Sequence, residues 1–155
     1  MSPLKPPAHV QQLTWGYCLP ACAQMALAQL NITVSQPQLA QLLGTRLGVG
    51  TPFSRVERLA ELNIHVRLLR HVPFDDLLAS LTTDTAIIVP ITTTSGLPGW
   101  GNIRTQHAIL VINVDVDWIS YHDPALSNGP VSARIAEFLL AWDEMDKQAA
   151  LLSRT

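Results

Sequence analysis

Two cysteines are the first candidates for chemistry, and both lie in the stretch LTWGYCLPACAQMAL, residues 13–27. Pro20 stands between Cys18 and Cys22, and proline is well tolerated in the first turn of a helix, so we predict a helix over residues 18–30. The N-terminal end of a helix favours an anion, which predicts a lowered thiol pKa and a nucleophilic thiolate at Cys18. Cys22, one turn further in, is expected to be an ordinary buried residue. The helix alone leaves open that both cysteines are simply core residues.

A nucleophilic cysteine needs a base, and His107 is the best placed of the five histidines. It follows the long Gly/Pro-containing loop of residues 95–106 and begins a predicted strand, a position from which a side chain can reach a cleft. A hairpin that turns around Asp115 would place Asp123 of the return strand opposite His107. A carboxylate there would orient the imidazole and stabilise its charged form. A single histidine is more often structural, so this interpretation depends on the pairing with Asp123.

An oxyanion donor is the remaining part, and Gln12 lies six residues before Cys18. Its side-chain amide, together with the Cys18 backbone N–H, could hold the negative charge that develops on a carbonyl oxygen under attack. Taken alone, this glutamine would be an unremarkable polar residue.

The order of predicted elements indicates the α+β class, with helices segregated from an antiparallel sheet. Ser35 and Gln38 match a capping box, Gly44 ends that helix, and Ser132 is expected to cap the last one. Alternating or β-branched runs indicate the strands. The helices are expected at residues 18–30, 36–43, 52–62, 72–81 and 133–145, and the strands at residues 64–69, 85–92, 107–114, 118–123 and 148–153.

Length and composition suit one globular domain. The chain has 155 residues, of which 48% are hydrophobic and 14% charged, and its net charge is −2. We therefore expect a single domain over residues 1–155 with an extended lead-in at residues 1–10. The absence of a basic run argues against nucleic-acid binding. No signal peptide or apolar run long enough to span a membrane is evident, so a cytoplasmic location is expected.

Two stretches carry a family resemblance: QQLTWGYCLPACAQMAL and QHAILVINVDVDWISYHDPAL. They resemble the signature regions of the papain-like bacterial peptidases that cut leader peptides after a double glycine and process bacteriocins. That family has a glutamine six residues before the nucleophilic cysteine, a histidine that opens a strand, and an aspartate about 16 residues later in an Asp-Pro step. Gln12, Cys18, His107 and the pair Asp123–Pro124 occupy those positions.

The resemblance implies a papain-like cysteine peptidase fold, with N-terminal helices packed on an antiparallel sheet, and hydrolysis of a peptide bond. It implies Cys18 as nucleophile, His107 as base, Asp123 as the residue that orients it, and Gln12 in the oxyanion hole. No metal or cofactor would be needed, and the partner would be a peptide or protein substrate. Because no transporter domain follows the matching region, a stand-alone member is expected.

Two residues beside Cys18 depart from the family pattern. Tyr17 replaces an aspartate and Leu19 replaces a glycine that would let a substrate backbone come close. These departures, and the apolar composition with Trp15 and Trp100, leave open a catalytically idle module that binds a peptide or leader on the same fold. A zinc site built from the two cysteines and a histidine, His107 or His122, is a further alternative.

Overall fold

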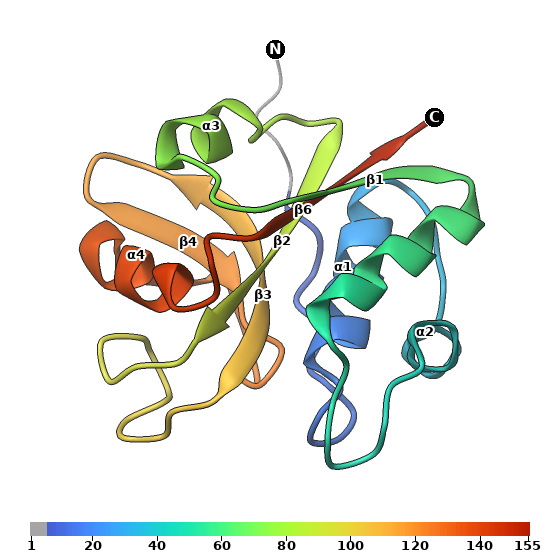
Figure 1. Ribbon diagram of the computed structural model, residues 1–155, viewed down its shortest axis with the longest axis horizontal. Coiled ribbons are helices and arrows are strands. Elements are labelled where there is room, and N and C mark those ends of the chain that lie inside the picture. The colour runs from blue at the N-terminus through green and yellow to red at the C-terminus, as the bar shows by residue number, and fades with distance from the viewer. Residues whose placement is uncertain (1–5) are drawn as a thin grey trace.

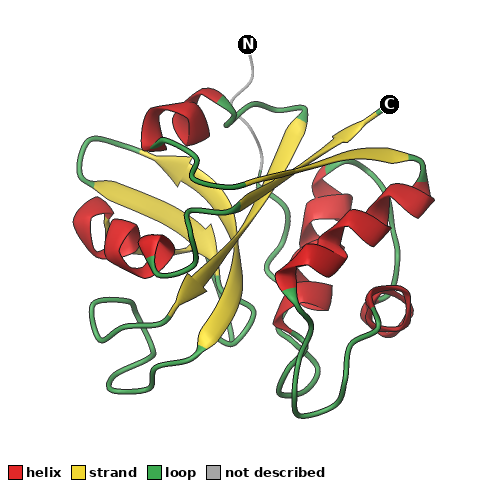
Figure 2. Cartoon of the chain, viewed as in Figure 1, coloured by secondary structure: helices red, strands yellow, loops and turns green. Residues whose placement is uncertain are grey.

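The computed structural model describes residues 6–155, so the first five residues of the expected lead-in lie outside the description. Residues 6–12 contain no helix or strand. Figures 1 and 2 show helices on both sides of one twisted sheet. The helical elements are α1 (Cys18–Gln29), α2 (Gln36–Leu43), the 3-10 helix η1 (Phe53–Leu62), α3 (Phe74–Ala79) and α4 (Ile135–Asp143). The strands are β1 (Ile64–Leu69), β2 (Thr85–Thr92), β3 (Gln106–Val114), β4 (Trp118–His122), β5 (Val131–Arg134) and β6 (Ala149–Arg154).

The six strands form a single sheet in the order β1-β6-β2-β3-β4-β5, and every paired neighbour is antiparallel. The C-terminal strand β6 therefore lies between β1 and β2, which are far apart from it in the sequence (Figure 1). The predicted α+β class and antiparallel sheet are confirmed.

The central strands are covered on both faces. Alternate residues of β2 enter two separate cores: Ile88 packs in the core under α1, α2 and η1, and Ile87 and Val89 pack in the core under α4. This explains why β2 reads as a continuous apolar run rather than an alternating one. The sequence analysis expected helices segregated from the sheet, whereas α4 returns to cover the opposite face, beside β4 in Figure 1.

Local signals fixed the ends of several helices. The Ser35 hydroxyl accepts from the Gln38 N–H, and the Gln38 side chain accepts from the Ser35 N–H, which completes the predicted capping box of α2. Gly44 ends α2 in the left-handed conformation with φ 68°. Within residues 6–155, none of the helices combines the length and the apolar character that crossing a membrane requires.

The cap predicted at Ser132 is wrong. Residues 131–134 form strand β5, which pairs with β4, and the helix begins only at Ile135 with Arg134 at its N-cap. Cross-strand contacts favour the strand: the Ser120 and Ser132 hydroxyls are 3.0 Å apart, and the Arg134 guanidinium lies 4.4 Å from the centre of the Trp118 ring. Pairing with a neighbouring strand outweighs the local capping preference of serine.

The predicted hairpin register is also wrong, by two residues. Leu110 lies opposite His122 rather than opposite Ser120, because the turn is wider than a turn centred on Asp115 and a bulge interrupts β3. The Asp115 carboxylate accepts the Trp118 N–H at 3.1 Å, which holds this wider turn. Because side chains alternate between faces, a shift of two residues keeps His107 and Asp123 on the same face, as diagonal rather than direct neighbours.

Candidate active site

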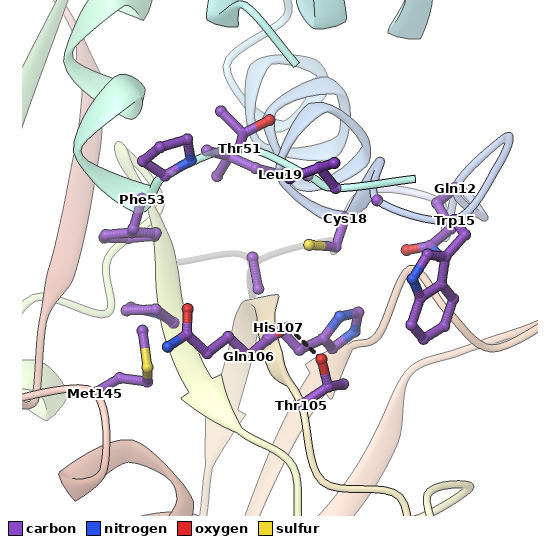
Figure 3. A pocket seen from close by; sticks show the side chains of 16 residues that line it. Gln12, Trp15, Cys18, Leu19, Thr51, Phe53, Thr105, Gln106, His107 and Met145 are labelled. Atoms are coloured by element: carbon purple, nitrogen blue, oxygen red, sulfur yellow. Dashed lines mark hydrogen bonds between the residues drawn. The ribbon is translucent and has the colours of Figure 1, made fainter. Parts of the chain in front are cut away.

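A cleft lies between the start of α1 and the start of β3, and the Cys18 sulfur and the His107 ring face each other across it (Figure 3). Its volume is about 360 Å³, within the range of clefts that bind small ligands or peptide side chains. Helix α1 supplies Cys18 at its first residue, and β3 supplies His107 at its second. Residues 89 positions apart in the sequence are thus brought together by the packing of α1 on β3.

The Cys18 thiol has the electrostatic environment of a nucleophile. Burial would raise its pKa, but a hydrogen bond and charge from His107, together with backbone N–H groups of Ala108 and Leu19, outweigh burial and hold the pKa below 9.0. The lowered pKa expected from the helix start therefore has more than one cause. The Leu19 N–H belongs to the first turn of α1, and the larger contribution comes from His107 across the cleft.

His107 is held between Cys18 and Asp123. Its Nε2 lies 2.6 Å from Asp123 Oδ1, and both side chains are almost completely buried. Since Nε2 is engaged by the carboxylate, Nδ1 is the ring nitrogen left to face the thiol. Burial would lower the pKa of His107, but hydrogen bonds to Asp123 and Cys18 and the charges of both raise it to about 9. A lowered Cys18 pKa and a raised His107 pKa favour a thiolate–imidazolium pair at neutral pH.

The Asp123 carboxylate has a partner on each oxygen. Besides His107, Oδ1 accepts from the Ala125 N–H at 2.9 Å, and Oδ2 accepts from the Trp100 Nε1–H at 2.9 Å. Burial would raise the pKa of Asp123, but the hydrogen bond and charge of His107, with the Trp100 and Ala125 donors, lower it. The Trp100 ring also contacts the His107 ring edge to face, with 4.8 Å between centroids. The carboxylate therefore stays ionised and fixed in orientation.

Gln12 lines the same cleft, two residues beyond the expected lead-in. Its backbone N–H donates to the Pro124 carbonyl at 2.7 Å, which ties it to the segment that carries Asp123. Its Oε1 atom is buried and has no hydrogen-bond partner among residues 6–155. The two ends of a glutamine amide have nearly the same shape, so a half-turn of the amide exchanges this oxygen for an N–H donor.

The two departures from the family pattern are accommodated without closing the cleft. Leu19 is 1% exposed, packs in the core under α1, α2 and η1, and forms part of the cleft wall. Tyr17 is the N-cap residue of α1 and is half-buried, with no side-chain capping bond. The Leu19 side chain therefore gives this part of the cleft wall an apolar surface, and a cleft of about 360 Å³ remains beside it.

Cys22 packs one turn behind Cys18, as expected. It is completely buried, and burial raises the pKa of its thiol well above 9.0. Both cysteines are free. Among residues 6–155, no three His, Cys, Asp or Glu side chains are grouped as a metal ion would need, so the zinc alternative finds no ligand set there.

The sequence analysis did not predict the neighbouring residues that hold Cys18, His107 and Asp123 in place. Trp100 was interpreted as an apolar residue available to a partner, but it is 5% exposed and donates to Asp123. Its only sequence signal was its place in the loop before His107. Trp15, by contrast, is 57% exposed and lines the cleft, in keeping with a role in contacting a bound molecule.

Comparisons with known proteins agree on the architecture. A protein from Bacillus anthracis described as a C39-like peptidase matches with a TM-score of 0.77 at 17% identity, over 95% of this chain and 94% of that one. The peptidase domain of Streptococcus ComA, a bi-functional ABC transporter involved in quorum sensing, matches with a TM-score of 0.77 at 20% identity, over 96% and 98%. The predicted papain-like fold is thereby confirmed. No protein of curated function proved similar to the chain.

The family model described as the Peptidase_C39 like family matches residues 7–150, nearly the whole chain. This match covers both stretches on which the resemblance was based, the one around Cys18 and the one from His107 to Asp123. The chain belongs to the Peptidase_C39 like family.

Proposed function

We propose that this protein is a cysteine peptidase that hydrolyses a peptide bond through Cys18, His107 and Asp123, with Gln12 in the oxyanion hole. The observation that carries the proposal is the chain of contacts from the Cys18 thiol, which lines the cleft, through the buried His107 to the buried Asp123, with the pKa of the thiol lowered and that of the imidazole raised. An idle binding module on the same fold would have no need of such a pair.

Each residue has a defined role in the reaction. The Cys18 thiolate forms a bond to the carbonyl carbon, and the carbonyl electrons move to the oxygen, which the Cys18 N–H and the Gln12 amide stabilise. The His107 imidazolium gives its Nδ1 proton to the leaving nitrogen as the C–N bond breaks. Neutral His107 then takes a proton from the water that attacks the thioester, and the thiolate is released. Asp123 keeps the ring oriented throughout.

The cleft favours an uncharged substrate segment. None of the 16 lining residues is Asp, Glu, Lys or Arg, and Leu19, Phe53 and Met145 contribute apolar side chains. The charges of Cys18 and His107 are paired with each other, so a charged substrate residue in this cleft would lose hydration without gaining a free counter-ion. We therefore infer that the substrate presents neutral, mostly apolar or small residues next to the scissile bond.

A peptide library tests this activity and preference together. Purified protein is expected to cleave a subset of peptides, and a Lys, Arg, Asp or Glu next to the scissile bond is expected to lower kcat/KM about tenfold or more, because the cleft offers no partner for the charge. Mass spectrometry of the products locates the bond, and the Cys18→Ala variant measures any contaminating protease. Cleavage that is equal in the variant, or indifferent to charge, would contradict the proposal.

Alkylation at low pH tests the thiolate without a substrate. At about pH 6, iodoacetamide is expected to modify Cys18 and to spare Cys22, because only the Cys18 pKa is lowered and Cys22 is fully buried. Intact mass gives the extent of reaction, and single Cys18→Ala and Cys22→Ala variants assign it. Equal, slow labelling of both cysteines, accompanied by no peptide cleavage, would favour the idle binding module instead.

A further inference from the structure

Residues 7–13, which begin within the expected lead-in and continue beyond it, lie across the boundary between the helices and the sheet and are called the strap. On the sheet side, His122 Nε2 donates to the Pro7 carbonyl at 2.7 Å, and His9 Nε2 donates to the Asp123 carbonyl at 2.8 Å. The two rings meet edge to face with 5.3 Å between centroids. This histidine pair, called the clasp, thus joins the strap to the backbone of Asp123. Figure 1 shows the strap, in blue, passing between the sheet and α1.

The strap is bonded to the helical side as well. Gln36, at the start of α2, is 3% exposed, and its Oε1 accepts from the Leu13 N–H at 2.7 Å while its Nε2 donates to the Gln11 carbonyl at 3.2 Å. Between these two anchors, Gln12 donates its own N–H to Pro124. The strap therefore links the side of the cleft that carries Cys18 to the side that carries His107, with Gln12 placed at the crossing.

We propose that His9 and His122 are positioning residues for the reaction: as a clasp they fix the strap on the Asp123 segment and thereby set the placement of Gln12 and Asp123 at the cleft. This proposal rests on the proposed peptidase function. Neither histidine lines the cleft, so their effect on catalysis would pass through Gln12 and Asp123.

The environment of His122 makes the stability of the clasp depend on pH. His122 Nδ1 is buried and has no hydrogen-bond partner within residues 6–155; it faces Gly129, where an added Cβ would lie 2.8 Å away. Burial is the largest effect and lowers the pKa of His122 below 6.5; the hydrogen bond to the Pro7 carbonyl opposes it, and the nearby His9 adds a smaller lowering. His9 is the titratable group that faces it from the strap, and the Asp123 carboxylate is turned toward His107 instead.

The sign of this dependence follows from the lowered pKa. The clasp is closed when His122 donates to Pro7 and open when this hydrogen bond is broken. Above about pH 6.5 the His122 ring is neutral in both forms, and the closed form has its full stability relative to the open one. As the pH falls below 6.5, the open form takes up a proton that the closed form resists, since a proton on Nδ1 would have no acceptor. The clasp is therefore expected to loosen in mild acid.

Two matched variants test the proposal through hydrogen exchange of the strap amides. His122→Gln keeps an N–H donor for Pro7 without a titrating group, and His122→Leu removes the donor. We expect His122→Leu to lower the protection factors of the Gln12 and Leu13 amides at least about tenfold at pH 7.5, with the amides of α1 unchanged. His122→Gln is expected to retain protection and to abolish the loss that we expect in the wild type between pH 6.5 and pH 5.

The same variants connect the strap to the active site. On a cleaved peptide, His122→Leu is expected to lower kcat/KM about 10- to 100-fold, because misplacement of the site by about 1 Å has effects of this size. His122→Gln is expected to rescue most of the loss and to flatten the acid side of the pH profile. Cys18 alkylation supplies a second readout that needs no substrate.

Each outcome decides the proposal. Unchanged strap protection in His122→Leu would overturn the clasp, and lost protection with unchanged kcat/KM and alkylation would overturn its positioning role. If the wild type cleaves no peptide and its Cys18 is no more reactive than Cys22, the proposed function fails instead. Hydrogen exchange distinguishes the two failures, because it reports the clasp whether or not the protein is an enzyme.

Discussion

Replacing Cys18 by alanine is expected to abolish peptide hydrolysis, with a fall in kcat of about 10⁴-fold or more. The thiol is the atom that bonds to the substrate carbonyl in the proposed mechanism, and alanine offers no nucleophile in its place. Because the oxyanion donors and the cleft remain, substrate binding is expected to change little, so the loss should fall on kcat rather than on KM. Steady-state kinetics on a peptide from the library measures both.

Cys22→Ala is the matched control for this experiment. Cys22 lies on the same helix, one turn further along, and is completely buried. Removing its sulfur leaves a small cavity, with an expected cost of about 1 kcal/mol in the free energy of unfolding and no loss of kcat. Thermal unfolding of both variants separates stability from activity. Similar kcat values in the two variants would exclude Cys18 as the nucleophile.

Much of the fold could be predicted because its signals are local. The capping box of Ser35 and Gln38, the glycine that ends α2, and the apolar run of β2 are each decided by residues close together in the sequence. The lowering of the Cys18 pKa has a local part only in the Leu19 N–H at the start of α1, and the larger contribution, from His107, is not local. Local preference and global packing agree at these places.

The errors concern contacts that the residue pattern of a single helix or strand does not encode. Ser132 was expected to cap a helix, but pairing of β5 with β4 decides its conformation. The hairpin register depends on how the Asp115 side chain shapes the turn, which the strand patterns do not encode. His107 and Asp123 still meet because the error was an even number of residues.

The surroundings of the candidate site were the least predictable part. Trp100 donates a hydrogen bond to Asp123 from a long loop whose path no periodicity indicates. Residues 7–10 of the strap were expected to be a simple extended lead-in, without the bond from His9 to the Asp123 carbonyl. Hydrogen bonds that join segments more than 100 residues apart, such as the one from His122 to Pro7, cannot be predicted from the sequence of either segment alone. The sequence could therefore indicate the reacting groups but not what holds them.

Asp123→Asn is expected to lower kcat at neutral pH by about 10²-fold or more and to move the alkaline limit of activity to lower pH. The wild-type limit should lie near pH 9, where the His107 imidazolium loses its proton. Asparagine removes the negative charge that raises this pKa, so the limit should fall toward the ordinary histidine value of 6.5. A pH series of kcat/KM and of Cys18 alkylation measures the shift.

Hydrogen-bond geometry makes this substitution worse than a simple loss of charge. The two carboxylate oxygens accept from His107 and from Trp100, so the amide NH₂ of asparagine must face one of these N–H donors. That contact leaves a buried donor without an acceptor. Trp100→Phe is the matched control, because it removes one donor and keeps the charge, and its alkaline limit should stay much closer to pH 9.

Stability gives an independent test of the same carboxylate. The raised pKa of His107 means that its ionic contacts stabilise the wild type fully below about pH 6.5, and that this contribution is lost as the pH rises through 9. In a Cys18→Ala background, where the opposing titration of the thiol is absent, denaturant unfolding should therefore show a fall in the free energy of unfolding as the pH rises above 6.5, and adding Asp123→Asn should make this fall smaller. If the alkaline limit and this fall are both unchanged in the variant, Asp123 cannot be the residue that holds His107 in its charged form.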